Sequence, residues 1–263
     1  MSCNQTNTYD YDSHIAEVYD QHETQTQDVE LIRRLVQGLG KLRILEPFCG
    51  TGRILIPLAQ DGHELVGLDQ ARPMLDRCRK KMAELPADVR RRITLIEADV
   101  TAGRWPESFD LVVMGNNCFY ELATPEEQKG CIASASRALK PGGYLYLDNN
   151  HMEGDLDESW RGSGIHEHTG TCEDGTRFEG TQETIWYDAP RRLWRCRRTV
   201  TITSPDGTVA KKEWIQQKHP VSVVEQREWL DAHGFAIEQL YGDRDGNPYT
   251  EASGHAIFWA RKV

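Results

Sequence analysis

The stretch Arg43-Ile-Leu-Glu-Pro-Phe-Cys-Gly-Thr-Gly-Arg53 decides the fold of this 263-residue chain. A short apolar run ends at an acid, Glu46, passes through a turn with two glycines, and continues into a predicted helix over 54–60. A second apolar run, 64–68, ends at Asp69. Two strands that each end in an acid and are joined by a helix are typical of a nucleoside-binding βαβ unit. In such a unit the second acid accepts hydrogen bonds from the ribose hydroxyls.

The same turn argues against a dinucleotide ligand. The dinucleotide fingerprint needs a glycine at the position of Phe48, and this chain keeps only Gly50 and Gly52. A carboxylate at the mouth of the turn, that of Glu46, would also repel a pyrophosphate and attract a cation. We therefore expect a ligand with a ribose and a positive group but no phosphate.

Further segments follow in a fixed order. Glu46-Pro-Phe-Cys-Gly-Thr-Gly52 has the form acid-x-x-x-Gly-x-Gly, and Asp69-Gln-Ala-Arg-Pro-Met-Leu75 and Ile93-Thr-Leu-Ile-Glu-Ala-Asp-Val100 come next. The run 109–116 reads as a fourth strand, and 139–147 as the turn into a fifth. In order and spacing these segments resemble the motifs of class I S-adenosylmethionine-dependent methyltransferases of the bacterial small-molecule type. S-adenosylmethionine carries an ammonium, a sulfonium and a ribose diol, which matches the ligand expected above.

The resemblance implies S-adenosylmethionine as the cofactor. It places Asp69 on the ribose diol, Met74 near the adenine, and Asp99 where it accepts from the adenine amino group. The full set of cofactor-binding residues that it implies is Tyr19, Glu46, Phe48, Gly50, Gly52, Arg53, Asp69, Gln70, Met74, Asp99, Val100, Gly115 and Asn116.

The pattern of predicted elements changes along the chain. Strands alternate with helices over 42–150, which is typical of a parallel sheet covered on both faces. Over 166–224 apolar residues recur with period two, and hairpin signals intervene. We predict an α/β fold: a Rossmann-like seven-stranded methyltransferase sheet with an inserted antiparallel β-sheet subdomain. The predicted division is an N-terminal helical lid and leading helix over 1–41, the cofactor-binding core over 42–150, the inserted sheet over 151–222, and the completion of the core over 223–263.

Methyl transfer is an in-line displacement, so the protein mainly aligns the nucleophile and excludes water. A general base is needed only if the nucleophile arrives protonated. His151 is the candidate base because histidine titrates near neutral pH, although a structural role is the alternative. The expected catalytic set is His151, Asn116 and Tyr19. The expected substrate contacts are Tyr11, Asn117, Tyr120 and Asn149. For Tyr11 and Tyr19, ordinary helix packing is an equal alternative.

The composition limits the classes of partner that this chain can bind. Lys and Arg total 31 against 41 Asp and Glu, a net charge of −10, whereas a nucleic-acid backbone requires a basic face. Seven cysteines without a Cys-x-x-Cys pair predict reduced thiols in a cytoplasmic protein. No apolar run predicts a signal peptide or a membrane span. His166-Glu-His168 lacks a third ligand, so we expect no metal. We expect a small-molecule substrate, no nucleic acid and no membrane, and leave a homodimer open.

The predicted function is methyl transfer to a small-molecule acceptor. The acidic balance favours N-methylation of an amine or amino-acid-like metabolite over O-methylation. A tRNA or protein methyltransferase is one alternative, although Gly115-Asn-Asn-Cys118 departs from the Asn-Pro-Pro-Tyr motif of amide and base N-methyltransferases. A non-catalytic protein that binds S-adenosylmethionine is another, because cofactor motifs indicate binding and not turnover.

Overall fold

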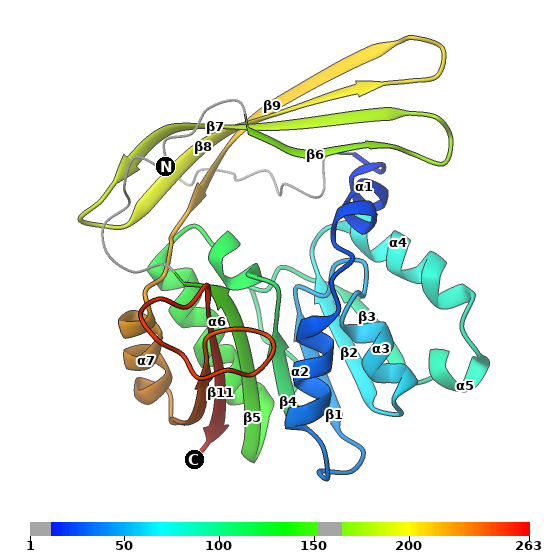
Figure 1. Cartoon of the computed structure of the whole chain (residues 1–263). Coiled ribbons are helices and arrows are strands. Elements are labelled where there is room, and N and C mark those ends of the chain that lie inside the picture. The colour runs from blue at the N-terminus through cyan, green and yellow to red at the C-terminus, as the bar shows by residue number, and fades with distance from the viewer. Residues whose placement is uncertain (1–11, 152–164) are drawn as a thin grey trace.

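The computed structural model describes residues 12–151 and 165–263, and two sheets dominate it (Figure 1). One is a seven-stranded sheet in the order β10-β11-β5-β4-β1-β2-β3, and the other has four strands in the order β6-β7-β8-β9. The predicted fold class, a Rossmann-like seven-stranded sheet with an inserted antiparallel sheet, is confirmed. Tyr11, one of the predicted substrate contacts, lies outside the described residues.

The large sheet is parallel except for β11, which runs antiparallel to both of its neighbours. Its central strands are apolar on both faces, as in any parallel sheet covered by helices on both sides. Parallel pairing brings the carboxyl ends of β1 to β5 to one edge. The strands are β1 (Arg43–Pro47), β2 (Glu64–Asp69), β3 (Ile93–Glu97), β4 (Phe109–Met114), β5 (Leu139–Asn150), β10 (Phe235–Tyr241) and β11 (His255–Lys262).

Helices cover both faces of this sheet. The last two α-helices begin at side-chain caps: Thr124 accepts from the Glu127 N–H, and Ser222 forms a reciprocal capping box with Glu225. No described helix is long and apolar enough to cross a membrane. The helices are α1 (Ile15–His22), α2 (Gln27–Leu35), α3 (Leu55–Gln60), α4 (Arg72–Ala83), α5 (Ala87–Arg90), the 3₁₀ helix η1 (Cys118–Glu121), α6 (Pro125–Ala138) and α7 (Val223–Ala232).

The inserted sheet stands above the carboxyl edge of the large sheet (Figure 1). Its strands are β6 (Ile165–Thr171), β7 (Arg177–Asp188), β8 (Leu193–Thr203) and β9 (Val209–Lys218), and neighbours are antiparallel. The alternation of β8 buries every second side chain on the inner face. Part of that face packs on Ile15 and Val18 of α1, and Trp194 and Cys196 pack beside Tyr120. The inserted sheet and α1 are therefore held over the edge where a ligand would bind.

Candidate active site

A cavity of about 1470 Å³ lies between the carboxyl edge of the large sheet and the inserted sheet. Single ligand sites usually measure about 300–1,000 Å³, so this volume suits two ligands side by side. Of the predicted site residues, those that line it are Tyr19, Glu46, Phe48, Gly50, Arg53, Asp69, Gln70, Met74, Asp99, Val100, Gly115, Asn116, Asn117 and Tyr120.

The glycine turn after β1 has the conformation that its sequence predicts. Gly50 and Gly52 both have positive φ, +51° and +79°. A Cβ on Gly52 would lie 2.6 Å from the Cys78 sulfur, so this glycine allows the turn to pack on α4 and does not line the cavity. The Gly50 N–H donates to Asp69 Oδ2 over 2.8 Å, which locks the turn to the end of β2.

Glu46, at the end of β1, offers a site for a cation. Its side chain is buried, and Oε2 has no hydrogen-bond partner among the described residues. Burial raises the pKa of Glu46 well above its usual range, although Arg53 opposes this. A buried carboxylate oxygen that lines a cavity without a partner fits the ammonium of S-adenosylmethionine.

The ends of β2 and β3 provide the acceptors that a nucleoside needs. Asp69 accepts a backbone N–H on each carboxylate oxygen, from Gly50 and from Ala71, and these bonds orient the carboxylate at the edge of the cavity. Asp99 is oriented by the N–H and hydroxyl of Thr101. Met74 and Val100 are buried apolar walls of the same part of the cavity. This cofactor half, as we call it, has the polarity expected for a ribose and an adenine.

The N-terminal segment closes the cavity from the side of α1. Arg53, just after the glycine turn, pairs with the fully buried Asp28 of α2 and donates to the Gln25 carbonyl over 2.7 Å. Burial raises the pKa of Tyr19 to about 12, so its hydroxyl keeps its proton at neutral pH. The Asn116 amide donates to Glu23 Oε2 over 3.0 Å and lies 3.4 Å from the Tyr19 hydroxyl.

Two consecutive asparagines follow β4 in an uncommon conformation. Asn116 and Asn117 have φ of 51° and 62°, which asparagine tolerates better than other residues with side chains. Asn116 Oδ1 accepts from Gln25 and from Arg244, and Asn117 Oδ1 accepts from the Asn150 N–H. Such a conformation typically costs about 1–3 kcal/mol and persists only where neighbours fix it, as these hydrogen bonds do.

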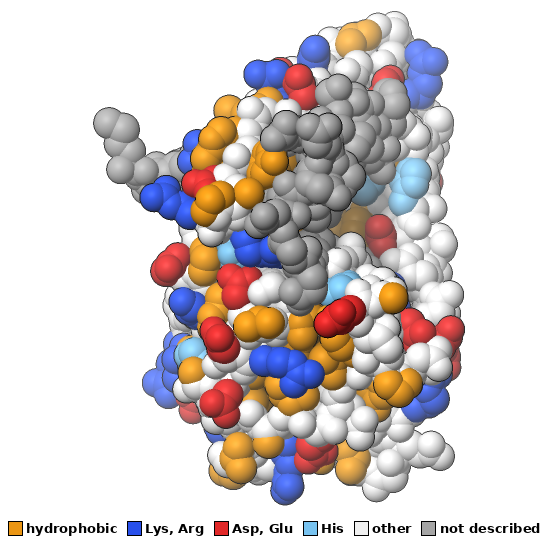
Figure 2. All heavy atoms as spheres, turned by 60° about the vertical axis from the view of Figure 1, so that its left-hand side comes forward, with side chains coloured by type: hydrophobic (Ala, Val, Ile, Leu, Met, Phe, Trp, Pro, Cys, Tyr) orange, Lys and Arg blue, Asp and Glu red, His pale blue; other side chains and the backbone are white. Residues whose placement is uncertain are grey.

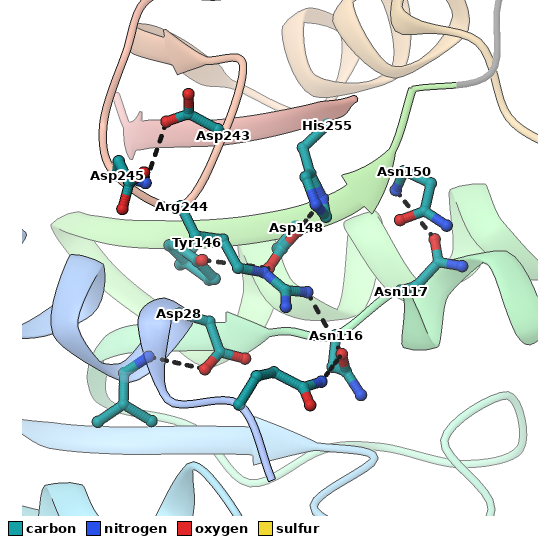
Figure 3. Close-up of polar contacts among 12 residues, drawn as sticks. Asp28, Asn116, Asn117, Tyr146, Asp148, Asn150, Asp243, Arg244, Asp245 and His255 are labelled. Atoms are coloured by element: carbon teal, nitrogen blue, oxygen red, sulfur yellow. Dashed lines mark hydrogen bonds and ion pairs between the residues drawn. The ribbon is translucent and has the colours of Figure 1, made fainter. Parts of the chain in front are cut away.

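Beyond Asn116 lies a buried charge cluster (Figure 3). Arg244 reaches between Asp148 and Asn116, with its Nε 2.9 Å from Asp148 Oδ2. Tyr146 also donates to Oδ2, and His255 Nδ1 lies 3.4 Å from Oδ1. Burial would raise the pKa of Asp148, but His255 and Arg244 outweigh it and lower that pKa. Asp148 lies within β5, which continues to Asn150 because β11 pairs with it that far.

The inserted sheet covers the cavity with polar side chains. Lys218 donates to Glu121 Oε1 over 2.6 Å, and Gln216 donates to Oε2 over 2.8 Å. Burial would raise the pKa of Glu121, but Lys218 and Arg198 lower it, so the carboxylate is ionised. Burial and the charge of Arg198 lower the pKa of His168 to about 4, so its imidazole is neutral. We call the part of the cavity between these polar side chains of the inserted sheet, Asn116 and His255 the acceptor half.

Comparison with known proteins assigns the family. A profile described as a methyltransferase domain matches residues 44–143. The cypemycin N-terminal methyltransferase of a Streptomyces species is 33% identical over 227 residues, covering 80% of this chain and 79% of that protein. The solved CcbJ methyltransferase of Streptomyces caelestis covers 98% of this chain and 100% of its own, at a TM-score of 0.71 and 18% identity. A solved sugar N-methyltransferase from a Streptoalloteichus species covers 100% of this chain and 99% of its own, at a TM-score of 0.72 and 19% identity.

This chain belongs to the S-adenosylmethionine-dependent methyltransferases. The identity to the Streptomyces enzyme over most of both chains shows the family, and the two solved structures share the fold of this chain. The recognition of the family from the ordered motifs is confirmed, as are the enzyme class and S-adenosylmethionine as the cofactor.

Besides Gly52, two predicted residues of this methyltransferase do not line the cavity. The Asn149 amide is buried and donates to Gln226 over 2.8 Å, so its contacts are those of the core. The Nε2 of His151, the predicted base, lies 2.9 Å from the Tyr249 hydroxyl, and His151 does not line the cavity. Asn149 lies within β5, and His151 directly follows this strand. Among the described residues, no group of three His, Cys, Asp or Glu is placed to hold a metal ion.

Several cavity residues were missed by sequence reasoning. They come from segments far from the motifs, and no local pattern marks most of them. The missed polar residues that line the cavity include Glu23, Gln25, Glu121, His168, Arg198, Gln216, Lys218, Arg244 and His255.

Proposed function

We propose that this methyltransferase N-methylates an amine on a small-molecule acceptor. The observation that carries the proposal is the position of Glu23. Its carboxylate lines the cavity and contacts Asn116, at the junction between the cofactor half and the acceptor half. A carboxylate at this junction suits an acceptor that arrives with N–H donors.

The hydrogen bonds of Glu23 leave room for such a donor. Oε2 accepts from Asn116 over 3.0 Å and from Gln25 over 2.5 Å. None of the hydrogen bonds within the described residues uses Oε1. A charge-assisted bond from an acceptor N–H to Oε1 would hold the nitrogen beside Asn116 and direct its lone pair.

The chain's residues bind, orient and exclude water. Glu46 would hold the ammonium of the cofactor, and Asp69 its ribose diol. S-adenosylmethionine supplies an electrophilic methyl on a sulfonium. Glu23 and Asn116 fix the attacking nitrogen, and α1 and the inserted sheet keep bulk water away. We also propose that the segments 1–41 and 151–222 act as covers over a catalytic core formed by 42–150 and 223–263.

The relatives support nitrogen as the target. The Streptomyces relative is named for an N-terminal methylation and covers 80% of this chain, whereas a ubiquinone biosynthesis O-methyltransferase covers 48% at 26% identity. A solved glycopeptide N-methyltransferase has the same fold at a TM-score of 0.55. Against a nucleic-acid acceptor, the face in Figure 2 mixes acidic and basic side chains on the core, and hydrophobic ones gather on the inserted sheet.

The test is a labelled-methyl assay with matched acceptors. Amino sugars, amino acids and short peptides with a free N-terminus are each compared with the N-acetylated form, alongside an RNA fraction and a metabolite pool. Mass spectrometry and NMR then locate the methyl. We expect transfer to nitrogen in a free-amine compound. Transfer to a hydroxyl, to acetylated compounds as fast as to free amines, or to RNA would refute the proposal.

Glu23→Gln tests the residue that carries the argument. We expect kcat/KM for the amine to fall by about tenfold to hundredfold, because a charge-assisted hydrogen bond is lost. Glu17→Gln is the matched control: it lies on α1, but its Oε1 accepts from the Glu173 N–H and the residue does not line the cavity. Equal kinetics in the two variants would remove Glu23 from the site.

A further inference from the structure

His255 lies on the acceptor side of the cavity with one edge of its ring against a buried carboxylate. Sheet pairing sets His255 opposite Asn150 and Ile257 opposite Asp148, so both groups stand on rigid strands. Nδ1 of His255 is 3.4 Å from Oδ1 of the fully buried Asp148. Figure 3 shows the ring directed from β11 toward that carboxylate.

The two nitrogens of this ring have different surroundings. Nδ1 and Asp148 Oδ1 are both buried, and neither has a closer polar partner among the described residues. The side chain as a whole is 27% exposed and lines the cavity. Nε2 is not among the buried unpaired atoms and takes part in no hydrogen bond within the described residues, and the side chain that carries it lines the cavity.

The carboxylate of Asp148 favours one tautomer of the neutral ring. Asp148 is ionised, because Arg244 and His255 itself lower its pKa in spite of burial. The groups that face this pair are Tyr146 from the same strand and Arg244 from the loop after β10. An ionised Oδ1 favours the tautomer with the proton on Nδ1, which leaves the lone pair on Nε2.

We propose that His255 is the general base that takes a proton from the acceptor amine, with Asp148 as the residue that positions it. The proposal rests on the proposed N-methylation. Alkyl amines are ammonium ions at neutral pH and have no lone pair for attack. The N–H bond breaks, the proton bonds to Nε2, and the electron pair stays on nitrogen for the attack on the methyl. The imidazolium then returns its proton to water.

This assignment replaces His151, whose Nε2 is occupied by Tyr249 and which does not line the cavity. The two histidines thus form a matched pair. Both lie near the end of the same strand pair, since the His151 N–H donates to the carbonyl of Gly254, next to His255. Of these two histidines, only His255 has a carboxylate beside Nδ1, makes no hydrogen bond through Nε2 within the described residues, and lines the cavity.

The first test needs no acceptor. Nitrogen-15 NMR of histidine-labelled protein with S-adenosylhomocysteine bound reads the tautomer of each ring, assigned by the His255→Asn variant. We expect the neutral form of His255 to carry its proton on Nδ1, and Asp148→Asn to change that pattern. A proton on Nε2, with Nδ1 as the acceptor, would overturn the proposal.

The second test uses the amine that the acceptor panel identifies as fastest. His255→Asn keeps an N–H donor toward Asp148 but removes the base, so we expect kcat at neutral pH to fall about 10²-fold. The affinity for S-adenosylhomocysteine should stay within twofold of that of the parent protein, and the urea midpoint of unfolding should stay close to it. Activity should recover as the pH approaches the pKa of the acceptor's own ammonium group. Added imidazole should restore part of the activity of His255→Ala. His151→Asn is the control and should lose less than about threefold.

The outcomes separate the two proposals. A parent-like pH profile in His255→Asn, with the methyl still found on nitrogen, would overturn the base and leave N-methylation standing. A methyl found on oxygen would overturn the proposed function whatever the variants show. A loss of kcat in His255→Asn without a changed pH profile or imidazole rescue in His255→Ala would mean that the residue is only structural.

Discussion

The two halves of the cavity are assembled in different ways. In the cofactor half, the bond between Gly50 and Asp69 joins residues 19 apart in sequence, within one βαβ unit. In the acceptor half, Glu23 and Asn116 are 93 residues apart, and Asp148 and Arg244 are 96 apart. A local unit can be recognised from its sequence, whereas long-range contacts need the whole fold. We therefore expect the cofactor half to keep its structure and its affinity when the acceptor half is disrupted. The structure of the acceptor half, in contrast, should depend on its buried charges.

The largest expected effect comes from breaking the acceptor half at Arg244. Arg244→Ala would leave the fully buried Asp148 without its guanidinium partner. Removing one member of a buried ion pair typically costs about 3–5 kcal/mol, because the other charge stays buried. Urea unfolding measures this loss directly.

The matched control for Arg244 is a surface pair. Arg33 also holds a carboxylate, that of Asp61, but its side chain is 37% exposed, so Arg33→Ala should cost less than about 1 kcal/mol. If the two variants lost the same stability, the cluster around Asp148 would not be the buried anchor of the acceptor half.

The next effect separates the two halves by function. Asp69→Ala should weaken S-adenosylhomocysteine binding by about 1–3 kcal/mol, since it removes the carboxylate at the end of β2 that we place on the ribose. Calorimetry gives the affinity, and the acceptor KM at saturating cofactor should change little. Asp110→Ala is the control, because Asp110 also accepts a backbone N–H, that of Arg43, but does not line the cavity. Equal losses of affinity in both variants would mean that the ribose lies elsewhere.

The same difference explains how much the sequence could predict. The parallel core, the inserted sheet and the residues of the cofactor half follow from strand ends and turns, because acids and glycines there face a ligand whose chemistry is shared by the family. The acceptor half could not be predicted in this way. His151 follows β5 and His255 begins the neighbouring strand β11. Only tertiary packing decides that Tyr249 contacts His151 and that Asp148 lies beside His255. Lys218 ends a strand of the insert, and nothing local indicates that it meets Glu121.

A smaller effect follows from the pKa of Glu46. In the ligand-free protein burial raises this pKa, so the protonated form persists to higher pH than for an ordinary glutamate, and a bound ammonium must displace that proton. S-adenosylhomocysteine affinity should therefore rise with pH by up to about tenfold per unit, and level off above the raised pKa. Glu46→Gln should bind more weakly and remove this dependence. A pH-independent affinity in the parent protein would place the ammonium away from Glu46.

The raised pKa of Glu46 has a second consequence, for stability. Between the ordinary glutamate pKa of 4.5 and the raised value, the folded state binds more protons than the unfolded state. The unfolding free energy of the ligand-free protein should then fall as the pH rises through this window. The decline should be absent in Glu46→Gln, which gives the binding experiment an independent check.

The smallest expected effect concerns the cover that both halves share. His14, just before α1, lies 3.0 Å from Asp174 in the β6–β7 turn and 2.8 Å from Asp12, and thereby joins α1 to the inserted sheet. Burial opposes protonation of His14, but hydrogen bonds to Asp174 and Asp12 outweigh it and raise its pKa.

A histidine whose pKa is raised in the folded state contributes stability that is complete below the unfolded pKa. That stability is lost as the pH rises through the folded pKa. Amide exchange of α1 should therefore be faster at pH values above that range, after correction for the intrinsic rate. Because the pair is partly exposed, we expect a change of only about twofold to fivefold, and salt should reduce it. His14→Gln should remove the pH dependence while the exchange of β1, deep in the cofactor half, stays the same. If α1 kept the same corrected protection at all pH values, the cover would be held by the contacts of Ile15 and Val18 alone.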